Sequence, residues 1–497
     1  MGSLRKQTLI SSILVYIGFF IGLINTYFYV RNGSFSQEQF GLTKIFFDFG
    51  QNMYAFASMG VIPVIYKFYP YYEDNLKENE IDLLSWAMVA SFIGFILVVI
   101  AGLYLKPFIV HNYIEKSKLI IDYYYWMFPF ALGMLFFSVL ESFCWAIHQT
   151  VISNFLKETL MRFITTIFIL LFYLKIISFS TFIYLFSSLY LIIFIVLVIY
   201  VLKIGKLHFS FTISRVTKKF YKKMLSMQLL LFSGTWIVSI AATIDSFIIA
   251  GFHNLGLASV GIFTLAQYVS NLIQVPQRSI QPASAGILSR AWKDKNMKEI
   301  ERIYYRSSIN LLLMSLFIFG NIWLNIRQGL EVMDVQKNYL AGLSTLFILA
   351  TARIVDAGTG INNMVINTST FWRFDFVSGI FLLAMRLPLT WFLIGHYGII
   401  GSAYADLFSM TMYNLVRFEF LRRKFNMQPF NLKTLYSIVL GIVAYVLCYY
   451  LLNGINGWIG IIVRSVLFSG LMIGGIFLFD LTPDAKQLYY KWRGIEQ

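Results

Sequence analysis

The chain has 497 residues, of which 58% are hydrophobic and only 13% are charged. Soluble domains carry about 25% charged residues, so the composition excludes a soluble globular protein and indicates an integral membrane protein. A net charge of +16 would suggest a nucleic-acid partner in a soluble chain. In a membrane protein it is explained by basic cytoplasmic loops and by attraction to anionic lipid. We therefore expect membrane lipid as a partner, and no nucleic acid.

The apolar segments predict an all-α integral membrane protein with about fourteen transmembrane helices. A span needs about 20 apolar residues. The first segment is longer than the apolar core of a signal peptide and has no small-residue cleavage site, so we expect it to be retained. The predicted spans are residues 8–30, 44–66, 83–105, 123–145, 158–177, 181–201, 229–252, 258–288, 308–326, 341–366, 374–396, 401–420, 435–452 and 458–479.

The loops between these spans predict the orientation of the chain. Lysines and arginines collect in every second loop when the N-terminus is placed in the cytoplasm. Because cytoplasmic loops carry the excess of basic residues, we predict that both termini are cytoplasmic. An even number of spans agrees with this orientation.

A repeat of about 220 residues divides the predicted spans into two halves. At this offset Phe40-Gly41 matches Val260-Gly261, and the charged segment 73–80 matches the charged segment 293–301. Parallel repeats of this kind enclose a central cavity in transporters. We therefore predict an N-terminal six-helix bundle, a basic cytoplasmic linker, a C-terminal six-helix bundle, and two extra helices with a tail: residues 1–202, 203–228, 229–425 and 426–497.

The segment from Asp245 onward contains the most unusual polar residues at membrane depth. Asp245 lies alone in the seventh predicted span, and the eighth contains Arg278, Gln281, Pro276 and Pro282. Such residues are costly in a membrane unless they line a polar cavity. We predict a substrate-binding role for Arg278 and Gln281, and a hinge at the two prolines. Asp245 is predicted either to couple an ion or to pair with Arg278.

The other intramembrane charges leave both structural and functional interpretations open. Lys44 and Asp48 are four residues apart, so they can pair on one helix face, or Lys44 can face the cavity. Arg353 has the same two interpretations: it can pair with Asp356, which follows it by three residues, or it can face the cavity. Arg386 has no close charged neighbour on its own helix and is a candidate for the cavity wall. Glu141 is predicted either to couple an ion or to form hydrogen bonds inside the bundle.

Several short stretches resemble the Wzx-type polysaccharide-lipid flippases, in the superfamily that also holds the MATE drug exporters and the lipid II flippases. The residues that carry the resemblance are Glu38–Thr43, Ala57–Pro63, Ala242–Ile249, Gly261 with Pro282, and Tyr397–Ala405. The resemblance implies two six-helix bundles around a cavity that opens to each side of the membrane in turn.

The same resemblance implies what the protein carries and where. The cargo would be a polyprenyl-pyrophosphate-linked oligosaccharide, such as an O-antigen repeat unit of lipopolysaccharide, moved to the outer leaflet of the bacterial inner membrane. Coupling to H⁺ or Na⁺ and association with other polysaccharide-assembly proteins are further expectations. An arginine would suit the pyrophosphate, since it makes bidentate phosphate contacts.

Three alternatives compete with this interpretation. Many MATE antiporters use an acidic residue in the first span, and lipid II flippases carry an arginine there, but residues 8–30 contain neither. A membrane-embedded glycan enzyme would need a large outer loop, and every predicted outer loop is short. The five histidines have no metal-ligand spacing. We therefore expect a transporter rather than an enzyme, with no metal and no cofactor.

Overall fold

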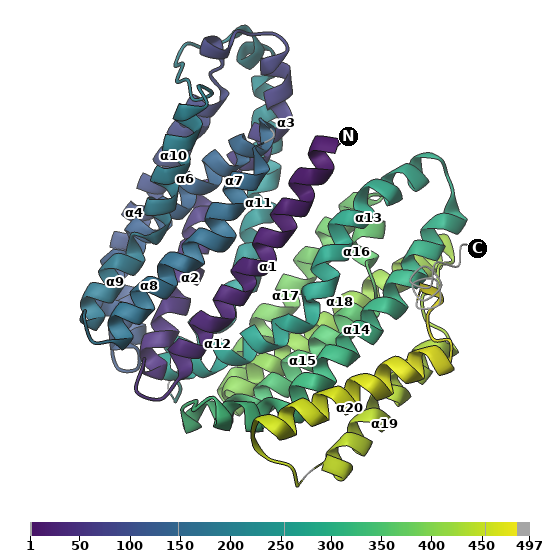
Figure 1. Ribbon diagram of the computed structural model, residues 1–497. Coiled ribbons are helices and arrows are strands. Elements are labelled where there is room, and N and C mark those ends of the chain that lie inside the picture. The colour runs from purple at the N-terminus through teal and green to yellow at the C-terminus, as the bar shows by residue number, and fades with distance from the viewer. Residues whose placement is uncertain (1, 148, 253, 453, 485–497) are drawn as a thin grey trace. The chain divides into compact units, whose positions relative to one another are not determined.

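Helices make up all the regular structure of the described part of the chain. The computed structural model describes residues 2–147, 149–252, 254–452 and 454–484 (Figure 1). Nine helices within these ranges are long and apolar enough to cross a membrane. The predicted all-α, multi-pass membrane fold is therefore confirmed, while the count of fourteen spans stays a prediction.

The chain forms two compact units, Met1–Gly261 and Ile262–Gln497. The boundary falls inside helix α12 (Leu257–Asn271). The predicted division into two bundles, a linker and a C-terminal pair stays a prediction.

The first unit contains the helices up to the start of α12. They are α1 (Gly2–Val30), α2 (Gln37–Ala57), α3 (Val61–Glu73), η1 (Glu78–Glu80), α4 (Leu83–Tyr113), α5 (Lys118–Asp122), η2 (Tyr124–Trp126), α6 (Met127–Ala146), α7 (Thr150–Asn154), η3 (Phe155–Leu160), α8 (Met161–Tyr173), α9 (Phe179–Ser187), α10 (Leu189–Lys203) and α11 (Arg215–Gly251). The second predicted span is broken into α2 and α3 at Gly60. Gly60 has φ 75°, in the left-handed region that favours glycine, so the span predicted for residues 44–66 contains parts of two helices.

Helix α6 is the centre of the first unit. It packs against α2, α3 and α10, and most of its residues are buried. Gly133 allows the closest approach, because a Cβ there would overlap the backbone of Tyr190 and Leu191 on α10. Beside it, the rings of Phe130 and Phe186 stack with centroids 5.6 Å apart. Dispersion between apolar helices gains from such close packing.

Helix α1 packs against a turn of π-helix, η3, that joins α7 to α8. A Cβ on Gly18 would overlap the backbone carbonyl of Glu158 in this turn. The Thr159 hydroxyl donates a 2.8 Å hydrogen bond to the carbonyl oxygen of Leu14. Short π-helical turns are rare and occur frequently at functional sites.

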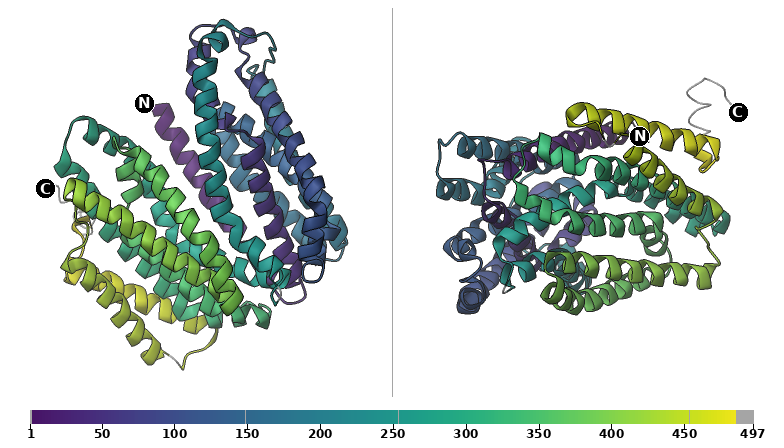
Figure 2. Two further views of the ribbon diagram at one scale, coloured as in Figure 1. Left: turned by 180° about the vertical axis from the view of Figure 1, so that it is seen from behind. Right: turned by 90° about the horizontal axis from the view of Figure 1, so that it is seen from below.

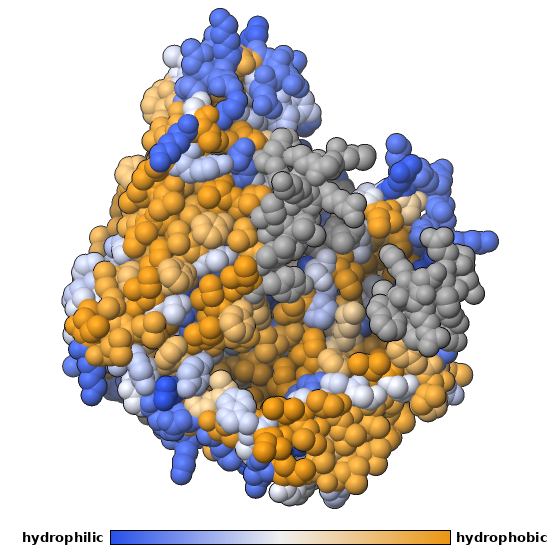
Figure 3. Space-filling model, in the orientation of Figure 1, coloured by the Kyte–Doolittle hydropathy of each residue, from blue (hydrophilic) through white to orange (hydrophobic). Residues whose placement is uncertain are grey.

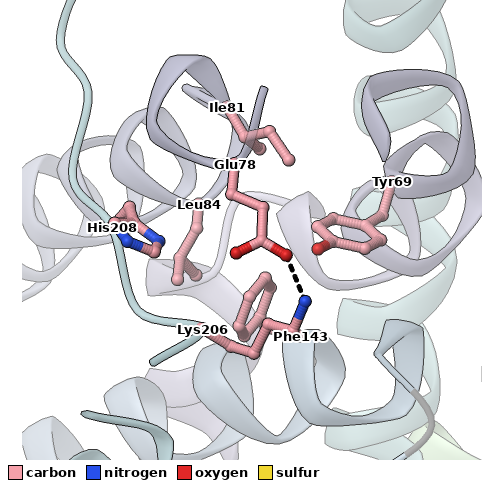
Figure 4. Close-up of a pocket in the computed structure, with 7 residues that line it drawn as sticks. All are labelled: Tyr69, Glu78, Ile81, Leu84, Phe143, Lys206 and His208. Atoms are coloured by element: carbon pink, nitrogen blue, oxygen red, sulfur yellow. Dashed lines mark hydrogen bonds and ion pairs between the residues drawn. The ribbon is translucent and has the colours of Figure 1, made fainter. Parts of the chain in front are cut away.

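The predicted basic linker is partly helical and is fastened to the first unit. Its second half forms the start of α11, with Ser214 as the N-cap. The Thr217 hydroxyl donates a 2.8 Å hydrogen bond to Asp82 at the start of α4. Nearer α10, Lys206 forms an ion pair with Glu78 of η1. Figure 4 shows this pair in a small pocket whose other lining residues are Tyr69, Ile81, Leu84, Phe143 and His208.

The hydrogen bond to Glu78 raises the pKa of Lys206 above its ordinary value. Because its pKa is raised, Lys206 contributes its full stabilisation to the folded protein below the ordinary pKa of lysine. This stabilisation is lost only as the pH rises through the raised pKa. The pair is therefore intact at neutral pH.

The second unit begins within α12 and contains the remaining helices. They are η4 (Leu272–Gln274), α13 (Val275–Lys293), α14 (Met297–Val332), η5 (Lys337–Gly342), α15 (Leu343–Gly358), α16 (Asn362–Asn367), α17 (Trp372–Tyr397), α18 (Ile399–Phe425), α19 (Leu432–Leu452) and α20 (Gly457–Leu478). Helix α18 packs against both α15 and α17, and α19 and α20 pack on each other and on α14 (Figures 1 and 2).

The surface has the pattern expected of a membrane protein. Apolar residues cover most of the helix sides on the face shown in Figure 3, and hydrophilic residues gather at helix ends. Water-facing ends and lipid-facing sides produce this division.

We expect Gly133→Ala to lower the thermal stability of the purified protein in detergent. The added methyl group has no room between α6 and α10, so the overlap should cost about 1–3 kcal/mol. The apparent melting temperature measures the effect. Gly379→Ala on α17 is the matched control, because nothing lies within 4 Å of its Cβ position. An equal loss in both variants would contradict the packing argument.

We expect Glu78→Gln to loosen the connection between α10 and α11. Without its ion-pair partner, Lys206 no longer fastens the linker to η1. Amide hydrogen exchange in residues 204–212 at neutral pH should become about two- to fivefold faster, as for loss of an exposed pair. Glu73→Gln, on an exposed residue at the end of α3 whose charge acts on Lys206 less strongly than that of Glu78, should speed this exchange much less.

Candidate functional site

Lys44, Asp48 and Asp245 lie together inside the first unit. The Lys44 ammonium and the Asp48 carboxylate are 2.8 Å apart, with 14% and 3% of their side chains exposed. Asp245 on α11 is buried and close enough for its charge to act on Asp48. Two carboxylates and an ammonium are thus gathered between α2 and α11, which are packed together.

The same two helices share a hydrogen-bonded set of uncharged polar residues. The Asn52 amide donates to the Thr243 hydroxyl, and the Ser239 hydroxyl donates to the Asn52 carbonyl, both at 2.8 Å. Asn52 was not predicted as a site residue. Lys44, Asp48 and Asn52 follow one another at intervals of four residues, so all three lie on one helix face. This spacing is the sequence signal that could have identified Asn52.

Glu141 is paired with a residue of the π-helical turn. Its carboxylate is 2.9 Å from the ammonium of Lys157. The next residue, Glu158, pairs with Arg162 at the same distance. Glu141 is 4% exposed, so α6 and η3 meet around a buried carboxylate.

Two arginines share one carboxylate inside the second unit. Asp406 on α18 lies 3.0 Å from Arg353 of α15 and 2.9 Å from Arg386 of α17. The side chains of Arg353, Arg386 and Asp406 are 10%, 11% and 1% exposed. Asp406 was missed in the sequence, although it directly follows the Tyr397–Ala405 stretch that carries the family resemblance.

Asp356 does not pair with Arg353, so one of the two interpretations left open by the sequence, a pair within one helix, is wrong. Its carboxylate instead accepts 2.9 Å hydrogen bonds from the amides of Asn414 and Gln274. Asn414 in turn accepts a 2.8 Å hydrogen bond from Asn362. A spacing of three residues permits a pair on one helix but does not require it, and Arg353 lies against Asp406 of the neighbouring helix α18 instead.

The predicted residues of the eighth span occupy different environments. Arg278 is exposed and Gln277 beside it is buried. Gln281 is partly buried, with its amide 3.4 Å from the Asn363 side chain. Asp245 belongs to the first unit and Arg278 to the second, so their pairing stays a prediction.

The two prolines also differ in their positions. Pro276 lies in the first turn of α13, where no intrahelical hydrogen bond is lost, so the span predicted for residues 258–288 is divided just before this proline. The irregularity lies just before it, in the 3₁₀ turn η4. Pro282 lies within α13. A hinge at these prolines stays a prediction.

The fold is shared with known transporters. No family model and no curated protein matches the chain. Among solved structures, it resembles a lipid II flippase, MurJ, in an inward closed conformation. The TM-score is 0.74, the sequence identity is 14%, and the match covers 95% of this chain and 99% of that one.

Two further structures belong to transporters of the MOP superfamily. One is an inward-facing MATE multidrug transporter, with a TM-score of 0.62, 15% identity, and 84% of this chain and 98% of that chain covered. The other is from Pyrococcus furiosus, and its binding pocket has a reversed polarity that suggests a different function. It gives a TM-score of 0.55 and 14% identity, with 85% of this chain and 96% of that chain covered. At these identities the likeness shows the fold alone.

We expect Asp406→Asn to destabilise the second unit strongly. The change leaves Arg353 and Arg386 buried without the carboxylate that they share, and breaking a buried pair costs about 3–5 kcal/mol. Thermal unfolding in detergent measures the loss. The double variant Asp406→Asn with Arg386→Met should recover part of it, because one uncompensated charge is removed.

Glu419→Gln is the control for this prediction. Glu419 pairs with Arg422 and Arg423 at the exposed end of α18. Its loss should cost less than about 1 kcal/mol. A double variant as unstable as Asp406→Asn alone would contradict the charge argument.

Proposed function

We propose that the protein is a flippase that moves a polyprenyl-pyrophosphate-linked oligosaccharide from the cytoplasmic to the outer leaflet of the bacterial inner membrane. The observation that carries the proposal is the pair of buried arginines that share Asp406. Two guanidinium groups held by one carboxylate keep an excess positive charge on these three residues. An arriving pyrophosphate can satisfy that excess by bidentate contacts.

The fold supports a lipid-linked cargo. The match to the lipid II flippase covers 95% of this chain, whereas the match to the MATE transporter covers 84%. Large cargo needs a membrane-embedded cavity that opens to each side in turn, which two-bundle transporters provide. In the second unit, Arg353 and Arg386 are the proposed cations for the head group, with Gln281 and Arg278 as further contacts. Lys44 is a separate proposed cation of the first unit.

A lipid II flippase is the second candidate, and the fold likeness favours it. The absence of an arginine from residues 8–30 argues against it, because the lipid II family carries one there. Two observations count against a drug antiporter with a cationic substrate. Residues 8–30 contain no acidic residue, and the two arginines that share Asp406 would repel a cation.

We expect deletion of the gene to cause loss of surface glycan and accumulation of undecaprenyl-linked oligosaccharide inside the cell. Arg386→Gln should have the same effect at normal protein level, because it removes one of the two arginines that share Asp406. Mass spectrometry of lipid-linked intermediates and gels of surface glycan measure both results. Arg423→Gln, on an exposed residue, is the matched control.

Two other outcomes would decide against this cargo. Accumulated lipid II with normal glycan would assign the chain to peptidoglycan synthesis. Normal glycan with altered sensitivity to drugs or dyes would place it with the antiporters.

A further inference from the structure

The buried carboxylate of Glu141 is satisfied on one side only. Its Oε2 accepts a 2.9 Å hydrogen bond from the ammonium of Lys157. Its Oε1 is buried and has no hydrogen-bond partner in the described part of the chain. The negative charge of Glu141 therefore depends on the lysine, because a buried carboxylate without a cation is costly.

Lys157 is far more accessible than its partner. Its side chain is 37% exposed, against 5% for Glu141. Consecutive residues of a helix point to different sides, so in η3 Lys157 contacts Glu141 of α6 while Glu158 contacts Arg162 of α8. A half-exposed ammonium at the predicted cytoplasmic end of α6 is within reach of an anion that enters from that side.

Among the described residues, Lys157 is the one cation whose charge acts on Glu141. The titratable groups that act on Glu141 from the described parts of the surrounding helices are acids, phenols and a thiol, apart from Lys157 itself. They are Glu158 of η3, Tyr54 of α2, Tyr190 of α10 and Cys144 of α6. Tyr66 of α3 acts in turn on Tyr54, and Arg162 of α8 acts on Tyr190. Glu158 carries a like charge and already holds Arg162.

We propose that the Glu141–Lys157 pair couples the entry of an anionic head group to the uptake of a proton by the first unit. A pyrophosphate takes the ammonium of Lys157, and Glu141, left buried without its cation, takes up a proton from the cytoplasmic water. Departure of the head group returns the lysine to Glu141, and the proton is released. The proposal rests on the proposed function, since it requires a pyrophosphate cargo.

The test measures proton uptake when a prenyl pyrophosphate binds. Geranylgeranyl pyrophosphate is titrated calorimetrically into the full-length protein in detergent at neutral pH, in two buffers that differ in ionisation enthalpy. The difference between the buffers gives the number of protons taken up. Glu141→Gln should bind the probe with about one proton less than wild type. The protonation of the probe itself is common to all variants and cancels in this comparison.

Lys157→Gln tests whether the Glu141–Lys157 pair links probe binding to proton uptake or only stabilises the structure. It should weaken binding about tenfold, through loss of a charged hydrogen bond. It should also abolish the extra proton uptake, because Glu141 is then neutral before the probe arrives. Glu158→Gln, in the same turn but paired with Arg162, should keep the uptake, and so should Glu141→Asp. Size-exclusion profiles and melting temperatures show that each variant is folded.

The outcomes distinguish this inference from the proposed function. Wild-type protein that does not bind the probe overturns both. Wild-type protein that binds it with the same proton uptake as Glu141→Gln and Lys157→Gln overturns the coupling alone and leaves the flippase proposal standing. Should Glu141→Gln fail to fold, the comparison between Lys157→Gln and Glu158→Gln decides in the same way.

Discussion

The need to neutralise buried charge is the constraint on which most of this structure depends. A charged side chain inside a membrane protein is tolerated when a partner lies within contact distance. Asp406 meets this need for two arginines from different helices. Glu141 meets it with Lys157. Because each interaction joins separate elements, α15, α17 and α18 are held together in the second unit, and α6 is held to η3 in the first.

Small residues and broken helices allow these elements to approach closely enough. Gly133 removes the side chain that would separate α6 from α10, and Gly18 does the same between α1 and η3. Helix α2 ends at Ala57, and Gly60, in the left-handed conformation, is the N-cap of the next helix, α3. The π-helical turn η3 and the 3₁₀ turn η4 change the direction of side chains without ending the backbone hydrogen bonding. Helix irregularity is thus concentrated near the polar residues.

The polar interior has a different character in each unit. Between α2 and α11 it is built from two carboxylates, one ammonium and short hydroxyl and amide side chains. In the second unit, two guanidinium groups surround a single carboxylate, and Asp356 is held by amides alone. The two arginines of the second unit suit an anionic head group. The carboxylates of the first unit suit a proton or a small cation.

The sequence by itself determined the helical membrane fold and identified several of the buried charges, among them Asp48, Glu141 and Asp245. Apolar length predicts a span regardless of its neighbours, and a charge within a span is visible without a structure. The Lys44–Asp48 pair follows from spacing on one helix. Only the tertiary structure decided that Arg353 turns to Asp406 rather than to Asp356, and that Lys157 reaches Glu141. These partners lie on different helices, and periodicity along one helix carries no information about which neighbouring helix it faces.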